Sequence, residues 1–175
     1  MEIVTTNQSI ETDEGEFLMK AEYINPFLSA SAEMIDQVTG LKTKMGKIYV
    51  KDVPYRSESI LVLIGITGGF RGSVVMSFSK EVCCKIASAM MGCSLITELD
   101  EMAKSAIGEL CNMIMGYTAT LFSRKEIVVD ITPPTILTGD NIQLSIPNTI
   151  VVCIPLLFED ESKIEINVSF AEDIS

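Results

Sequence analysis

Three polar residues on one apolar segment have the types and the spacing to do chemistry together. They are Ser105, Glu109 and Asn112, and with Gly116 they follow the series i, i+4, i+7 and i+11. At about 100° per residue, this series falls on one narrow stripe of an α-helix. The opposite side is apolar and carries Ala106, Ile107, Leu110, Met113, Ile114, Tyr117 and Leu121. The pattern predicts a helix that presents a carboxylate and a carboxamide outward.

Helix-weakening residues accompany this stripe. An outward Glu and Asn are most often solvated surface residues, so the pattern alone does not establish a site. However, Gly108 and Gly116 lie within the predicted helix, where Gly costs about 1 kcal/mol relative to Ala, and Asn112 is also a poor helix former. Two explanations stay open: the glycines let another molecule approach the helix closely, or they permit tight packing of a neighbouring helix.

The chain lacks the usual machinery of a self-sufficient hydrolase. A carboxamide such as that of Asn112 cannot act as a base near neutral pH, and Ser105 has no adjoining base that would make it a nucleophile. The sequence contains no His, which excludes Ser-His-Asp and Cys-His triads and a His-containing zinc site. A reaction at this stripe would therefore need groups that the stripe itself does not supply.

Three helices are predicted, and the last of them carries the stripe. Thr97-x-x-Asp100 predicts a capping-box start for a helix that reaches about Ser123. Before it, Ser79 predicts the N-cap of a shorter helix through Met91 that is ended by Gly92. The pair Asn25-Pro26 predicts the start of the first helix, which runs through Val38 before Thr39-Gly40.

Segments rich in β-branched residues predict strands before and after the two later helices. These strands are residues 48–53, 59–67, 72–78, 126–132, 142–145, 149–158 and 163–170. The second and third are predicted to form a hairpin, and the last two to be joined by the polar turn at 159–162. Apolar and polar residues alternate along the last strand, so one sheet face is expected to be buried and the other is free to be solvated.

The element order predicts an α+β fold, with a mixed, mostly antiparallel sheet covered by helices on one side. A residue pattern that occurs twice predicts two pseudo-repeated halves. The segment 29–40 has the same spacing of Ser, Glu and Gly as 105–116, 76 residues later, with Glu33 and Asp36 in the places of the later Glu and Asn.

Length and charge limit the organisation and the partners. The 175 residues fit one domain, and 13 basic against 24 acidic residues give a net charge of −11, which argues against nucleic-acid binding. Residues 1–18 hold five acids and no Lys or Arg. We expect them to be a disordered acidic tail, either an added leader or a native extension, before a domain at 19–175.

Cysteine usage predicts a reducing compartment. The number of cysteines is odd, and no C-x-x-C spacing occurs among Cys83, Cys84, Cys93, Cys111 and Cys153. Buried free thiols are therefore the favoured interpretation over a redox role. Neither a secretion signal nor a stretch long enough to span a membrane is apparent, so we expect a cytoplasmic protein.

The stripe lies within a family signature. Residues 99–116, LDEMAKSAIGELCNMIMG, resemble the motif of the CheC/CheX/FliY family of chemotaxis phosphatases: a Ser or Asp, a Glu four later, an Asn three after that, and a Pro about twenty residues further on. Pro133 and Pro134 lie in that region, and even Pro134 is about one residue short of the usual spacing, which a loop can absorb.

Other segments resemble the CheX branch of this family. These are MKAEYINPF at 19–27, KIASAMMG at 85–92 and the VSF strand that ends at residue 170. The resemblance covers essentially all of 19–170. CheC-type members carry two Glu/Asn sites, whereas the first copy here has Glu33 and Asp36. A carboxylate beside a phosphoryl group adds repulsion, so we expect this degenerate second site to be inactive.

The resemblance implies an activity and a partner. The protein would hydrolyse the aspartyl phosphate of a CheY-type response regulator, which would bring its own Mg²⁺ and Lys, and this chain would bind no cofactor. Asn112 would hold the attacking water and Glu109 would pair with the regulator's lysine. Ser105, Gly108 and Gly116 would be partner contacts. CheX-like relatives are homodimers that pair through their sheets, so a homodimer is expected, without nucleic acid or membrane partners.

Two other functions stay open. A non-catalytic module of the same fold would dock on a response regulator or a flagellar motor component, and its binding would survive loss of the Asn112 amide. An unrelated hydrolase would use Glu109 as a general base, and it would need a pocket with a second polar group that the sequence does not identify.

Overall fold

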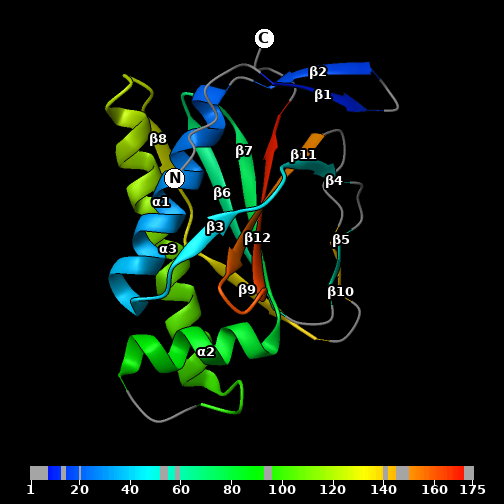
Figure 1. Cartoon of the computed structure of the whole chain (residues 1–175). Helices are drawn as coiled ribbons and strands as arrows, with labels where there is room; N and C mark the ends of the chain where they lie inside the picture. The colour runs from blue at the N-terminus through cyan, green and yellow to red at the C-terminus, as the bar shows by residue number, and fades with distance from the viewer. Residues whose placement is uncertain are drawn as a thin grey trace.

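Three helices lie against one face of an eight-stranded antiparallel sheet (Figure 1). The helices are α1 (Ala21–Thr39), α2 (Lys80–Met91) and α3 (Glu101–Ser123). This computed structural model describes residues 8–12, 15–19, 21–51, 55–57, 60–92, 96–139, 142–144 and 150–171. Within them, no helix is both long and apolar enough to cross a membrane.

The main sheet pairs strands from early and late parts of the chain. The strands are β3 (Thr43–Met45), β4 (Tyr49–Lys51), β6 (Ile60–Gly68), β7 (Gly72–Phe78), β8 (Val129–Ile131), β9 (Thr135–Thr138), β11 (Ile150–Phe158) and β12 (Lys163–Phe170). Their order is β3-β11-β12-β7-β6-β8, with β4 also on β11 and β9 also on β6. Thus β3 and β4, which directly follow α1, pair with the late strand β11, and β8 and β9, which directly follow α3, pair with the early strand β6. Reciprocal pairing of this kind is compatible with two repeated halves, which stay a prediction.

The predicted fold class is confirmed, because every strand pairing among the described residues is antiparallel and the helices cover one face. The hairpin of β6 and β7 and the turn between β11 and β12 form as predicted. The strand predicted at 126–132 is only three residues long. The short strands β3 and β9 were not predicted, nor was β5 (Tyr55–Ser57), which pairs with β10 (Ile142–Leu144) outside the main sheet.

The first helix begins earlier than predicted. It starts at Ala21, so Pro26 lies inside it and the predicted Asn25 cap is wrong. Pro26 has no N–H for the carbonyl of Glu22, four residues before it. Instead, Lys125 Nζ, just beyond α3, donates to that carbonyl at 3.1 Å. A contact with a distant part of the chain thus replaces the hydrogen bond that the proline removes.

The other two helices begin at capped ends. Ser79 Oγ accepts from the N–H of Val82 at 3.2 Å, and Gly92 ends α2 with a φ of 57°, both as predicted. At the start of α3, Asp100 Oδ1 accepts from the N–H of Ala103 at 2.8 Å. Asp100 is therefore the N-cap, and the capping box predicted from Thr97 is wrong. The predicted end of this helix at Ser123 is confirmed.

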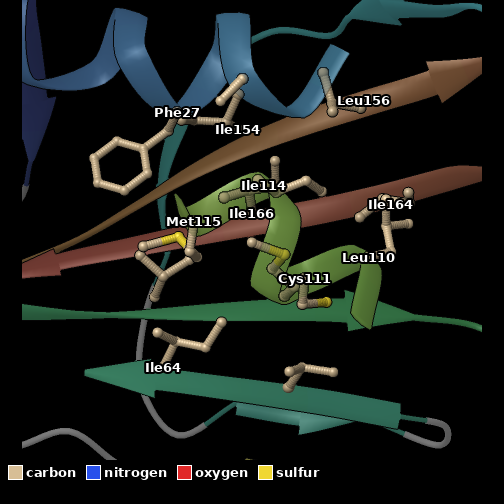
Figure 2. Packing of buried hydrophobic residues seen from close by; sticks show 14 of the residues in the cluster. Phe27, Ile64, Leu110, Cys111, Ile114, Met115, Ile154, Leu156, Ile164 and Ile166 are labelled. Atoms are coloured by element: carbon tan, nitrogen blue, oxygen red, sulfur yellow. The ribbon is translucent and has the colours of Figure 1, made fainter. Parts of the chain in front are cut away.

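The main core lies between the helices and the sheet. Figure 2 shows Leu110, Cys111, Ile114 and Met115 of α3 among side chains from the strands and from α1. All four are almost completely buried. Burying an aliphatic side chain of this size contributes about 1.5–3 kcal/mol, so this face fixes the position and rotation of α3 on the sheet.

The opposite sheet face is less exposed than predicted. Leu61, Val75 and Val151 form a small second core there, against which residues of β9 and β10 pack. Asn167, predicted to be on the solvated face of β12, is fully buried, and its Nδ2 donates to the Val75 carbonyl at 2.9 Å. The second face, which the alternation left free to be solvated, is therefore buried along this part of β12.

A hairpin lies within the segment predicted to be a disordered tail. The strands β1 (Gln8–Thr12) and β2 (Gly15–Met19) pair with each other as a separate two-stranded sheet. Residues 1–7 and 13–14 lie outside the described residues. The division of the chain at residue 18 stays a prediction.

An ion pair joins α2 to the turn between β11 and β12. Lys85 Nζ donates to Asp160 Oδ2 at 2.7 Å, and it also lies 4.5 Å from the centre of the Phe158 ring. The side chain of Ser162 donates to the other carboxylate oxygen of Asp160. The hydrogen bond from Lys85, followed by that from Ser162, lowers the pKa of Asp160 to about 2.

This ion pair predicts a pH-dependent difference in stability between wild type and Asp160→Asn. The carboxylate stabilises the fold only while ionised, so the difference is fully present above its ordinary pKa of 3.8 and disappears as the pH falls towards about 2. Urea unfolding of both proteins from neutral to acid pH, at low and high salt, measures it. Glu159→Gln is the matched control, because Lys85 pairs with Asp160 and not with this neighbour. A difference independent of pH would contradict the prediction.

Candidate active site

The predicted stripe of α3 faces solvent. Ser105, Glu109, Asn112 and Gly116 are all exposed, as the helical spacing predicted. The buried face of the same helix holds them there, so their direction is set by the core and not by contacts among themselves. Asn112 lies one turn from Glu109, close enough for one bound molecule to contact both.

An open groove runs beside this stripe. Ser105, Gly108, Glu109 and Asn112 form its helical side, and its volume is about 510 Å³. The other wall consists of residues at the end of β8 and the start of β9, namely Ile131, Thr132, Pro133, Pro134 and Ile136. The two prolines were singled out from the sequence, but the rest of this wall was not. The signal for it is a proline pair between two short runs of β-branched residues.

Glu109 is the one charged residue among those that line the groove. Its carboxylate is exposed and has no cation beside it on the groove walls, so it is available to a cation from another molecule. The groove also presents the carboxamide of Asn112 and the hydroxyls of Ser105 and Thr132. These groups orient and bind, whereas none is a strong base or an activated nucleophile.

The two glycines of α3 have different surroundings. A Cβ atom on Gly108 would lie 3.2 Å from Cδ1 of Ile136, so close packing against β9 accounts for this glycine. The chain thus uses Gly108 for packing, but against a strand and not the neighbouring helix considered from the sequence. A Cβ on Gly116 would meet nothing within 4 Å. Packing among the described residues therefore does not account for Gly116.

The buried thiols of the core are unreactive. Cys83, Cys84, Cys111 and Cys153 are free and buried, as predicted, while Cys93 lies outside the described residues. Burial raises the pKa of Cys83 and of Cys111, which lies behind the exposed stripe. Both therefore stay protonated near neutral pH and are poor nucleophiles.

The related segment of α1 is arranged differently. Asp36, which stands where α3 has Asn112, accepts a hydrogen bond from Lys42 and forms an ion pair with it. Glu33 accepts from Gln37 Nε2 at 3.4 Å. Both acids thus have partners within the chain, in contrast to Glu109. That this second site is inactive stays a prediction.

Among the described residues, no group of three or more His, Cys, Asp or Glu side chains is placed to hold a metal ion. The groove itself offers one carboxylate, which is too few for a dedicated site of oxygen ligands.

Comparison with known proteins identifies the family. The family model described as Chemotaxis phosphatase CheX matches residues 60–157, more than half of the chain. The CheY-P phosphatase CheX of Thermotoga maritima is 40% identical over 126 residues, which make up 72% of this chain and 81% of that protein. The chain belongs to the CheX family. The matched region contains α3 and both walls of the groove.

Solved CheX structures share this fold. A CheX from Desulfovibrio desulfuricans, 24% identical, superposes with a TM-score of 0.77 over 85% of this chain and 99% of that chain. A CheX–CheY–BeF₃–Mg²⁺ complex from Borrelia burgdorferi is 27% identical and has a TM-score of 0.73, over 86% of this chain and 98% of that chain. The CheX fold predicted from the resemblance is thereby confirmed.

The glycines of this CheX-family helix predict two different stability effects. Gly116→Ala places a methyl group in open space and removes the entropic cost of Gly in a helix, so it should raise the free energy of unfolding by about 1 kcal/mol. Gly108→Ala should gain less, because Ile136 must move to make room. Urea or thermal unfolding of the two variants measures the effects. Equal gains would contradict the packing role of Gly108.

Proposed function

We propose that this chain accelerates hydrolysis of the aspartyl phosphate of a CheY-type response regulator. The observation that carries the proposal is the exposed pair of Glu109 and Asn112 on the wall of an open groove. Support comes from the 40% identity to a CheY-P phosphatase. An exposed site of this kind suits a protein substrate, since a macromolecular partner can cover an open groove and exclude water from it.

Asn112 orients the attacking water. Its carboxamide oxygen accepts from the water and so directs the water's lone pair at phosphorus, in line with the bond to be broken. The water oxygen bonds to phosphorus while the bond between phosphorus and the aspartate oxygen breaks. The aspartate leaves as a carboxylate, and both protons of the water end on the inorganic phosphate. Phosphoryl transfer of this type needs little covalent help, so positioning contributes most of what the chain adds.

Glu109 fixes the docking register. As the one charged residue lining the groove, it forms an ion pair with the regulator's lysine, one turn of helix from the carboxamide. Ser105 contacts the partner at the rim of the groove, where no base adjoins it. Gly116 lets the partner's surface approach α3 closely, because no described residue lies within 4 Å of where its Cβ atom would be.

The regulator brings the Mg²⁺ that neutralises charge on the phosphoryl oxygens. The CheX–CheY–BeF₃–Mg²⁺ complex from Borrelia burgdorferi supports this division, as does the single carboxylate of the groove. The reaction takes place in the cytoplasm, in keeping with the free buried thiols. The homodimer stays a prediction from the family resemblance.

Asn112→Ala and Glu109→Ala should separate turnover from binding. Loss of the carboxamide should reduce the rate of dephosphorylation about 100-fold with little effect on binding, because positioning of the water is lost. Loss of the carboxylate should weaken binding about tenfold. Both are measured with a phosphorylated CheY-type regulator and Mg²⁺. Glu33→Ala and Asp36→Ala are the matched controls on α1 and should change neither quantity.

The alternative outcome is equally clear. If the wild type binds several such regulators without speeding the loss of phosphate from any of them, the chain is a docking module and not a phosphatase. If binding and turnover both survive in Asn112→Ala, the carboxamide does not position the water.

Gly116→Ala tests the docking face independently of folding. The variant is expected to be more stable than the wild type, yet to bind the regulator about tenfold more weakly, because its methyl group occupies space that the partner needs. Isothermal titration with a beryllofluoride-activated regulator measures the affinity. Glu33→Ala, on the exposed face of α1, is the control and should bind as the wild type does. Unchanged affinity in Gly116→Ala would show that the partner does not reach this position.

A further inference from the structure

The groove wall opposite Asn112 is an irregularity in the edge of the sheet. Ile131, at the end of β8, pairs with Ile66 of β6, and Thr135, at the start of β9, pairs with Leu63. Between these two pairs β6 has two residues, 64–65, whereas the segment that joins β8 to β9 has three, 132–134. Three residues opposite two is a β-bulge, a feature that bends an edge strand and redirects its residues. Proline is tolerated at such a place because no ladder hydrogen bond is needed from it.

Gly65 and Thr132 hold this bulge in place. The N–H of Gly65 donates to Thr132 Oγ1 at 2.8 Å, and the N–H of Thr132 donates to the Gly65 carbonyl at 3.0 Å. A Cβ atom on Gly65 would lie 3.1 Å from Cγ2 of Thr132. The two residues are thus in reciprocal contact with no spare room, and Pro133 and Pro134 follow directly with their φ angles fixed.

The other end of the sheet has the same bulge with different residues. Met45 of β3 pairs with Leu156, and Tyr49 of β4 pairs with Cys153, so residues 46–48 stand opposite two residues of β11. There the N–H of Gly46 donates to the Pro155 carbonyl at 2.8 Å, and a Cβ on Gly46 would lie 3.1 Å from Pro155 Cβ. This bulge contains no proline pair and follows α1, where Glu33 and Asp36 have partners within the chain. The molecule therefore provides a second close glycine contact, at the other end of the sheet from Thr132.

We propose that Gly65 and Thr132 are positioning residues for the phosphatase site. Their reciprocal hydrogen bonds set the distance of Pro133 and Pro134 from Asn112, and this distance limits where a docked phosphoryl group and its water can lie. Gly65 lies on β6, the strand next to the groove wall, and would affect the groove only through Thr132. The proposal rests on the function proposed above, because it assigns the groove wall a role in that same reaction.

Gly65→Ala and Gly46→Ala test the proposal as a matched pair. Each adds a methyl group 3.1 Å from its neighbour, so each should lower the melting temperature by a similar amount. A shift of the wall by a few tenths of an ångström should reduce kcat for dephosphorylation about tenfold in Gly65→Ala, with regulator affinity changed less than about threefold. In Gly46→Ala, kcat should stay within about twofold of wild type. Equal losses of kcat in the two variants would overturn the proposal.

A second substitution shows whether the effect passes through Thr132. In Gly65→Ala/Thr132→Ser the Cγ2 atom that the new methyl group meets is gone, while the hydroxyl that accepts from residue 65 remains. This double variant should recover kcat to within about threefold of wild type, whereas Gly65→Ala/Thr132→Val, which keeps the bulk and loses the hydroxyl, should not. Failure of the Ser variant to recover turnover would overturn the positioning role.

The geometry is testable without any regulator. The side-chain amide NMR signals of Asn112 should shift in Gly65→Ala and not in Gly46→Ala, because only the first moves the wall beside it. If the wild-type protein speeds no dephosphorylation but this contrast holds, the proposed function fails and the link between Gly65 and the groove stands. If the wild type is active and neither NMR signals nor kcat distinguish the two variants, the positioning proposal fails alone.

Discussion

The burial of one face of α3 is the constraint on which the candidate site depends. Leu110, Cys111, Ile114 and Met115 are fixed between α1 and the sheet, and a helix so held cannot rotate without exposing them. Because residues three and four apart share a face, the exposed stripe is then fixed as well. Neither Glu109 nor Asn112 needs a partner within the chain to hold its direction. The polar groups are thus left free for another molecule.

The second wall of the groove depends on pairing between strands that are distant in the sequence. The bulge beside α3 exists because β8 and β9 both pair with β6, a strand from early in the chain, with one residue more than β6 can match. The helix and its opposing wall are therefore positioned by different parts of the fold: the helix by apolar burial, the wall by hydrogen-bond register. The antiparallel sheet, which pairs early with late strands, brings the helix and the wall within reach of one partner.

This division explains what could be predicted from the sequence. The stripe of α3, the ends of α2 and the β11–β12 turn follow from local periodicity and capping, so they were predicted. Apart from Pro133 and Pro134, the wall was not predicted, because β9 is a short strand directly after this proline pair and its pairing with β6 is a long-range choice of register. The early start of α1 was missed for a similar reason, since Lys125 satisfies the carbonyl that Pro26 leaves without a donor. Local sequence patterns thus predicted the helical side of the groove, whereas the side formed by β8 and β9 depends on non-local strand pairing.

The exposure of the stripe has an electrostatic consequence. In water, an ion pair with Glu109 would contribute little, because the high dielectric constant and salt weaken it. When a partner covers the groove, the same pair lies in a medium of lower dielectric constant beside apolar Ile131 and Ile136, and its interaction becomes stronger. Bulk water likewise occupies the hydrogen-bonding groups of the Asn112 carboxamide until docking removes that water. Under the proposed function, an open groove with one charge would become a specific site when a partner that carries the reacting group covers it.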